Sequence, residues 1–297
     1  MRAITAEEVT QFWADGVVQL QQVLDDQDVA LLDRALTASY EQLPAAGAYY
    51  DITAAGDKLA QQGIAVLRDK VNVTKDKKGR FTAAVGVWML VPTVREFIFE
   101  SSLPKIAAAL LRSRKVNLYD DQVLFKAPLT EDHTAFHQDQ PYFNVDGNKV
   151  CVIWASPDLI TGDMGPMQYV RGSHLWGPTF KPNLFVSNVP LPGAEGEAQP
   201  DIEADRGRYD IVTYATKPGD VIVHHYKTIH GSHGNASVDR TRRAISVRYC
   251  GDDVRYHLRP SALAQPHHKH ALREGDPIDS GAHPVVWRAE DAIEQRP

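Results

Sequence analysis

The sequence predicts a mainly β protein with flanking α-helices, in which the core is a double-stranded β-helix, a jelly roll of the cupin type. Three observations predict this fold. Short β-rich runs separated by Gly, Pro, Asn and Asp fill residues 115–256. Helical patterns gather before these runs, in residues 1–114, instead of alternating with them, which argues against a parallel α/β sheet. The GxGxxG and Walker patterns of nucleotide-binding sheets are also absent.

The first 114 residues are expected to be mainly helical. Thr5 and Glu8 have capping-box spacing, so a helix is predicted to follow Thr5 and to end near Asp15 and Gly16. Residues 44–82 show no clear period. The other elements expected here are a strand at 17–20, a helix opened by Asp25 and Asp26, and helices at 91–100 and 103–111.

From residue 115 onward the chain carries the β-rich runs of the jelly roll. Residues 179–209, rich in Pro, Gly, Asn and acids, are predicted to be a long insertion between strands, and loops of this length are often functional. We expect a single domain spanning 1–297. The predicted strands lie within residues 115–128, 149–158, 167–174, 209–215, 220–225 and 243–250.

Composition narrows the class of partner. The net charge of −6 and the pI of about 6.0 give no basic surface for phosphates, so nucleic acid is not expected. No apolar run is long enough for a membrane span, and the polar N-terminus does not resemble a signal peptide, which favours a cytoplasmic protein. Cys151 and Cys250 lie in apolar runs and are expected to be buried thiols.

His137 and Asp139 are the central candidates for a metal site. They follow a strand-like run, and residues two apart on an extended chain project from the same face, so both side chains can reach one ion. One His-x-Asp pair is weak evidence in a chain with 12 histidines. A second histidine-rich block at 219–249 strengthens it, because a distant strand can supply a third ligand.

Four histidines of that block, His224, His225, His230 and His233, compete for the third position. His230 is favoured because it ends a β-run, before Gly-Ser. His224 and His225 are adjacent, so only one of them can face the metal, and hydrogen-bonded structural roles are the simpler explanation for the other three. Two imidazoles and one carboxylate on one face form the facial triad that Fe(II) prefers, with positions left open for cosubstrate and oxygen.

An arginine downstream of the last ligand would bind the distal carboxylate of a 2-oxo acid through its planar fork. The candidates are Arg240, Arg242, Arg243 and Arg248. Surface charge is the simpler explanation for Arg240 and Arg243. Along the predicted strand, one face carries Arg242, Ala244, Ser246 and Arg248, where small residues beside arginines leave room for a bound acid.

These blocks resemble the phytanoyl-CoA dioxygenase family of Fe(II)- and 2-oxoglutarate-dependent oxygenases. The motifs that carry the resemblance are DQVLFKAP, HQDQPYF, VCVIWASPD, RGSH and GDVIVHHYKTIHGSHGN followed by RRAISVRY. The resemblance spans most of the chain. It implies Fe(II) as the metal, 2-oxoglutarate as the cosubstrate and O2 as the oxidant.

The same resemblance implies His137, Asp139 and His230 as iron ligands, with His225 matching a family histidine that is not a ligand. It implies Arg242 as the residue that binds 2-oxoglutarate. One extra residue between the last histidine and this arginine, compared with some members, keeps Arg240 as an alternative. The family positions that line the 2-oxoglutarate pocket match Gln122, Trp154 and Ser232. The family's lysine on the same strand matches Lys126.

Asp139 also bears on the reaction. The family's halogenases have a small residue in place of this carboxylate, so its presence predicts hydroxylation or another oxidation. Two other functions stay open: a cupin-like hydrolase or isomerase that uses the same residues with zinc or manganese, and a binding protein without catalysis.

The substrate is expected to be a small, partly apolar organic molecule, bound by a monomer or homodimer. Residues 44–82 and 179–209 are the expected lid and pocket segments, with simple packing as the alternative role of each aromatic. These aromatics are Tyr49, Tyr50, Phe180 and Phe185. Lysines that can attract an anionic substrate, or lie on a solvated surface, are Lys70, Lys75 and Lys77.

Overall fold

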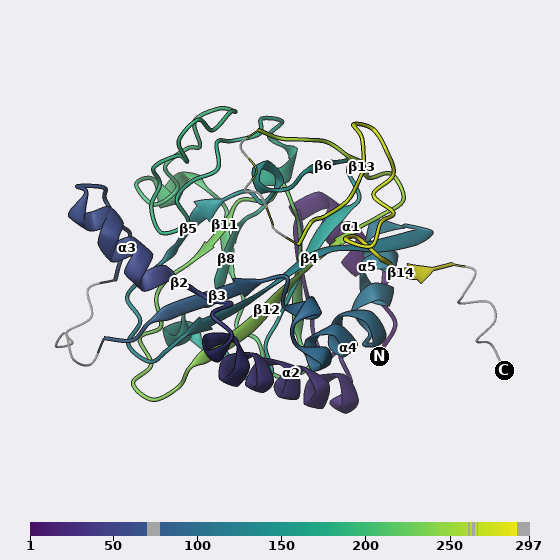
Figure 1. The fold of residues 1–297 in the computed structure, drawn as a ribbon, viewed down its shortest axis with the longest axis horizontal. Coiled ribbons are helices and arrows are strands. Elements are labelled where there is room, and N and C mark those ends of the chain that lie inside the picture. The colour runs from purple at the N-terminus through teal and green to yellow at the C-terminus, as the bar shows by residue number, and fades with distance from the viewer. Residues whose placement is uncertain (70–77, 261, 263–264, 266, 290–297) are drawn as a thin grey trace.

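A computed structural model describes residues 1–69, 78–260, 262, 265 and 267–289. Two β-sheets form the jelly roll (Figure 1). The larger sheet has the strand order β1-β10-β7-β12-β4-β3-β2, with β14 paired to β4, and the smaller has the order β5-β11-β8-β9. A separate pair joins β13 and β6.

The strands are short, with the exception of the two longest, β4 and β12, which pair along nine positions. Their bounds are β1 (Val17–Leu20), β2 (Tyr50–Asp51), β3 (Phe81–Val85), β4 (Lys115–Lys126), β5 (Thr134–His137), β6 (Val145–Asp146), β7 (Val150–Ala155), β8 (Met167–Val170), β9 (Ile211–Thr213), β10 (Val221–His225), β11 (His230–Ser232), β12 (Arg242–Cys250), β13 (Arg255–Tyr256) and β14 (Val285–Arg288).

Helices cover the outer face of the larger sheet, and α2 and α4 lie side by side along it in Figure 1. Leu36, Phe97 and Ile106 from three helices share one apolar cluster with Ile153 and Val247 from the sheet. Each such buried side chain stabilises the fold by about 1.5–3 kcal/mol. The helices are α1 (Ala6–Asp15), α2 (Asp26–Ala45), α3 (Ile52–Gln61), α4 (Pro92–Glu100) and α5 (Leu103–Leu111).

The other face of the larger sheet looks toward the smaller sheet. Trp154 and Ile222 are cross-strand partners on this face, and they share a buried cluster with Met167 and Tyr169 from β8. Helices cover the outer face of the larger sheet. A site that needs polar side chains in a dry interior is therefore expected between the two sheets.

The predicted N-terminal elements are confirmed. Thr5 and Glu8 form the capping box of α1, and Gly16 ends the helix in the left-handed region at φ 74°. A Cβ at position 16 would lie 2.4 Å from Nδ1 of His174, so glycine is needed for space as well as conformation. Asp25 caps α2 as expected. Cys151 and Cys250 are buried free thiols, also as expected.

Residues 44–82 differ from the prediction, because they contain α3, β2 and part of β3. The first 114 residues therefore supply strands as well as helices, and β1, β2 and β3 all belong to the larger sheet. Residues 179–209 lie between β8 and β9 with only a 3-10 helix at Arg206–Arg208. In the described parts of the chain, no helix combines the length and the apolar character needed to cross a membrane.

Candidate active site

Three predicted side chains meet between the sheets. The register of β5 and β11 sets His230 directly opposite His137, and Asp139 lies just beyond the end of β5. The Nε2 atoms of His137 and His230 each lie 3.9 Å from a carboxylate oxygen of Asp139. None of the three is more than 7% exposed. Their candidate ligand atoms all lie within 4.8 Å of one another, which is the size of a single-ion site.

Backbone carbonyls fix both imidazoles. Nδ1 of His137 is 2.8 Å from the Ala135 oxygen, and Nδ1 of His230 is 2.9 Å from the Thr228 oxygen. Since only the nitrogen can donate to a carbonyl, each Nδ1 carries the hydrogen and each Nε2 presents a lone pair to the shared centre. This is the tautomer that a metal ligand needs.

Burial sets the charge of the site. It lowers the pKa of His137 and of His230 to about 4 each, helped by the neighbouring imidazoles. Burial alone would raise the pKa of Asp139, but His230 and His224 hold that pKa well below its ordinary value. At neutral pH the three side chains therefore present two neutral nitrogens and one carboxylate, the combination that a divalent ion binds.

His224 is a fourth imidazole at this site. Its Nε2 lies 3.1 Å from Oδ2 of Asp139, and its ring centre is 4.3 Å from that of His230. His225 points the opposite way, as adjacent residues of a strand must, and its ring packs near Phe12. Because side chains alternate along a strand, the sequence showed that only one of His224 and His225 could face the site, but not which one.

A narrow cavity of about 30 Å³ extends from the triad toward Arg242. Arg242 is 1% exposed and donates from Nη1 to the Gly165 oxygen at 2.7 Å, while its Nε has no hydrogen-bond partner among the described residues. Burial lowers the pKa of Arg242 to about 10, so it is charged at neutral pH. The Nε1 of Trp154 and the Oγ1 of Thr134 are also buried without such a partner within the described chain.

Of the other residues predicted to bind 2-oxoglutarate, some line the narrow cavity and some do not. Gln122 lines the narrow cavity and accepts from Nη2 of Arg248 at 2.7 Å. Lys126 donates to Oγ of Ser232 at 3.0 Å and to the His233 carbonyl, so these two predicted residues contact each other but do not line the cavity. The alternative, Arg240, has a side chain 43% exposed, pairs with Asp163 and lies outside it.

A larger cavity of about 520 Å³ meets the narrow one at the triad. Both predicted segments contribute to its wall, 44–82 through Tyr50 and 179–209 through Phe185. The other two predicted aromatics do not line it: Tyr49 borders a different cavity, and Phe180 packs in a separate apolar cluster. Lys70, Lys75 and Lys77 lie outside the described residues. The residues common to both cavities are Gln122, His137, Asp139, Phe185 and Arg248.

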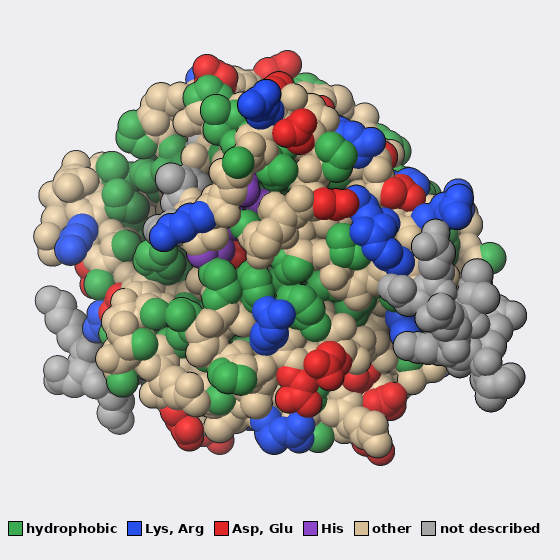
Figure 2. Space-filling view, turned by 45° about the vertical axis from the view of Figure 1, so that its right-hand side comes forward, with side chains coloured by type: hydrophobic (Ala, Val, Ile, Leu, Met, Phe, Trp, Pro, Cys, Tyr) green, Lys and Arg blue, Asp and Glu red, His purple; other side chains and the backbone are tan. Residues whose placement is uncertain are grey.

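The outer surface agrees with a buried, mainly apolar site. In the space-filling view, histidine side chains are visible in a recess bordered by hydrophobic ones (Figure 2). Acidic and basic side chains are interspersed on the face shown there. The larger cavity is polar only in places, through side chains that include Asp120 and Asn183.

Comparison with known families decides the assignment. The family model described as phytanoyl-CoA dioxygenase matches residues 12–244. The chain belongs to the phytanoyl-CoA dioxygenase family. A search of curated protein sequences gave no match.

Solved structures with the same fold include enzymes of nogalamycin biosynthesis. The "non-heme alpha ketoglutarate dependent carbocyclase SnoK from nogalamycin biosynthesis" is 21% identical, with a TM-score of 0.66 over 96% of this chain and 97% of its own. The epimerase SnoN, solved with Fe3+, alpha ketoglutarate and nogalamycin RO, is 21% identical, with a TM-score of 0.62 over 95% and 98%. EctD from S. alaskensis, solved with 2-oxoglutarate and 5-hydroxyectoine, is 19% identical, with a TM-score of 0.58 over 92% and 85%.

The predicted family resemblance and the jelly-roll fold are therefore confirmed. The chain is an enzyme of the Fe(II)- and 2-oxoglutarate-dependent oxygenase superfamily. The hydrolase, isomerase and pure binding functions are not favoured. Two candidates have positions that the sequence did not assign to them: His224, considered as a third ligand, contacts Asp139, and Arg248, considered as a cosubstrate arginine, lines both cavities.

Proposed function

We propose that this phytanoyl-CoA dioxygenase family member hydroxylates a small, partly apolar organic molecule at iron held by His137, Asp139 and His230. The single observation that carries this proposal is that the three donors converge at the junction of two cavities. Overall, substrate, O2 and 2-oxoglutarate give hydroxylated product, succinate and CO2. Iron bound at the triad supplies the oxygen chemistry that amino-acid side chains lack.

The donor set fits Fe(II). Two neutral imidazole nitrogens and one carboxylate on one face leave the opposite positions open. His224 supports this arrangement by contacting the second carboxylate oxygen of Asp139, which orients that carboxylate. The carboxylate also disfavours halogenation, since halide would need the place that Asp139 fills.

Arg242 is proposed to bind the distal carboxylate of 2-oxoglutarate. Its Nε, together with the indole of Trp154 and the hydroxyl of Thr134, offers buried donors that lack partners in the described chain, and unpaired buried donors are costly unless a ligand meets them. A cavity of about 30 Å³ is too small for a five-carbon diacid, so the surrounding side chains must move when it binds. Phe185 and Arg248 border the larger space into which they can shift.

The larger cavity is proposed to hold the substrate. Its aromatic and aliphatic wall, which includes Tyr50, Phe143 and Leu191, suits an apolar portion, and Asp120 and Asn183 suit a polar one. Ring closure or epimerisation is the second candidate outcome, because SnoK and SnoN share this fold and carry those names. A cytoplasmic location and a monomeric or homodimeric state are part of the same proposal.

The test is 2-oxoglutarate turnover by anaerobically iron-loaded protein, with succinate and product measured across a metabolite panel. We expect succinate release coupled to product, and its loss in Asp139→Ala and His137→Ala. His257→Ala, which changes a histidine whose side chain is 43% exposed, is the matched control and should keep full activity. Failure of the iron-loaded protein to bind 2-oxoglutarate would contradict the proposal, as would full activity of Asp139→Ala.

A further inference from the structure

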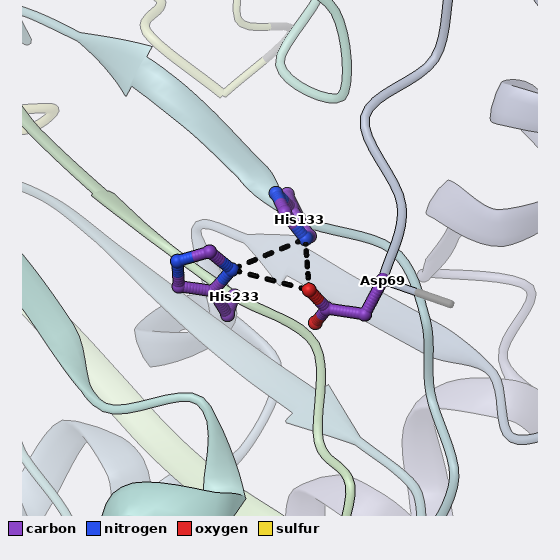
Figure 3. A group of neighbouring side chains, drawn as sticks. All are labelled: Asp69, His133 and His233. Carbon is purple, nitrogen blue, oxygen red and sulfur yellow. Dashed lines mark hydrogen bonds and ion pairs between the residues drawn. The ribbon is translucent and has the colours of Figure 1, made fainter. Parts of the chain in front are cut away.

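A second group of metal-binding side chains lies outside the active site. Asp69, His133 and His233 come from three different segments and converge on one point (Figure 3). The backbone N–H of Asp69 donates to the Glu131 carbonyl at 3.0 Å. His133 directly precedes β5, and His233 directly follows β11.

We propose that these three side chains form a second metal site, which takes a zinc-class divalent ion. Oδ1 of Asp69 lies 2.8 Å from Nε2 of His133 and 3.2 Å from Nδ1 of His233, and the two nitrogens are 3.3 Å apart. A tetrahedral ion with bonds of 2.0–2.1 Å holds its ligand atoms about 3.3 Å apart. The triangle of donor atoms therefore has nearly the size that zinc needs.

The carboxylate is held in a fixed orientation. Its second oxygen, Oδ2, accepts from the Gly234 N–H at 2.8 Å, which leaves Oδ1 for a single metal bond. Position 234 needs glycine, since a Cβ there would lie 2.2 Å from the Thr130 oxygen and 3.0 Å from Oδ2.

The site is open to solvent on one side. The side chain of His133 is 12% exposed, whereas those of Asp69 and His233 are 34% and 37% exposed. Two histidines and one aspartate make three ligands, and water from the exposed side can complete the tetrahedron. Imidazole with carboxylate suits zinc better than magnesium or calcium, which prefer oxygen ligands alone.

The expected role is a cross-link between the strands that carry the active-site histidines. His133 is four residues from His137 and His233 three from His230, so an extended chain separates the two sites by about 10–13 Å. A zinc ion would cross-link the start of β5, the end of β11 and the backbone at Asp69. The His233 carbonyl also accepts from Lys126, which extends this cross-link to β4.

Zinc binding to the full-length apoprotein tests the proposal, with zinc per chain measured after dialysis. We expect Asp69→Asn and His233→Gln each to bind one equivalent fewer than the natural sequence. His257→Gln is the control for a lost exposed histidine and should bind as many equivalents as the natural sequence. Circular dichroism confirms that each variant is folded.

A second measurement separates this site from the active site. In a His137→Gln, His230→Gln double variant, zinc at a hundredfold excess over Kd should still raise the melting temperature, by about 5 °C. Adding His233→Gln should abolish that rise and weaken zinc binding at least about tenfold. The proposal is overturned if the double variant binds no zinc, or if Asp69→Asn and His233→Gln keep the natural stoichiometry and the thermal shift.

Discussion

Replacing Arg242 is the sharpest probe of the cosubstrate site. Its guanidinium is almost fully buried, and among the described residues only the Gly165 carbonyl accepts from it. Two charge-assisted hydrogen bonds to a carboxylate in such a setting are strong, and removing one partner of a buried pair costs about 3–5 kcal/mol. At about 1.4 kcal/mol per decade, Arg242→Met should weaken 2-oxoglutarate binding by roughly a hundredfold to a thousandfold or more.

Arg242→Lys refines the estimate. Lysine keeps the charge but loses the fork, so one of the two hydrogen bonds is lost, and 2-oxoglutarate binding should weaken by about tenfold to a hundredfold. Arg240→Ala is the matched control, because its exposed pair with Asp163 is worth at most about 1 kcal/mol and lies outside the cavity. It should change 2-oxoglutarate affinity by no more than about twofold.

The assay is calorimetric titration of 2-oxoglutarate into anaerobic, iron-loaded protein, with the Kd of each variant compared at one pH. Denaturant unfolding of the same samples shows whether the Gly165 carbonyl, left without its donor, has weakened the fold. The reasoning is refuted if Arg242→Met binds 2-oxoglutarate as tightly as the natural sequence. It is also refuted if Arg240→Ala produces the large loss instead.

Three further predictions concern the surrounding histidines and strands. His224→Phe keeps an aromatic ring but removes the contact with Asp139. Iron affinity, measured in a competition titration, should therefore fall about tenfold to a hundredfold. Unchanged affinity would contradict the proposal that His224 orients Asp139. Gly231→Ala should lower the free energy of unfolding in urea by about 1–3 kcal/mol and weaken iron binding. The new Cβ would lie 2.8 Å from the Thr134 oxygen and push β11 away from β5. A stable variant with a full complement of iron would be evidence against the pairing register of β5 and β11. Burial lowers the pKa of His225 to about 3. Between about pH 6.5 and pH 3 this histidine is therefore protonated in the unfolded chain but neutral in the folded chain, so the free energy of unfolding falls as the pH is lowered through this range. In His225→Gln the free energy of unfolding should fall less steeply between pH 6.5 and pH 4, because about one fewer proton is taken up on unfolding. Identical slopes in the variant and the natural sequence would disprove that His225 is neutral in the folded chain.

Local signals predicted the elements whose stabilising contacts lie within a few residues. The capping box of α1 and the cap of α2 involve neighbouring side chains, so their starting points were readable from the sequence. By contrast α3 was missed although Asp51 caps its first turn, and this helix buries only Ile52, Thr53 and Gly56. The strand β3 (FTAAV) was missed because two of its five residues are alanines, which are depleted in strands.

The site was predictable to the extent that strand parity decided it. The alternation along β12 put Arg242, Ser246 and Arg248 on the face that lines the narrow cavity. His137 and Asp139 do meet, but Asp139 lies past the end of β5 in a helical conformation, so the extended chain assumed for this pair ends at His137. Parity alone does not say which face of a strand looks inward. That is why His224 could not be separated from His225, and why the contact between His133 and His233 had no signal in the sequence.

The wall shared by the two cavities has a consequence for how ligands must be presented to this enzyme. Phe185 and Arg248 border both spaces, so any movement that admits 2-oxoglutarate also reshapes the chamber beside it. We expect the affinity for the substrate to differ between protein with and without bound 2-oxoglutarate. Substrate screens should therefore be run with 2-oxoglutarate present.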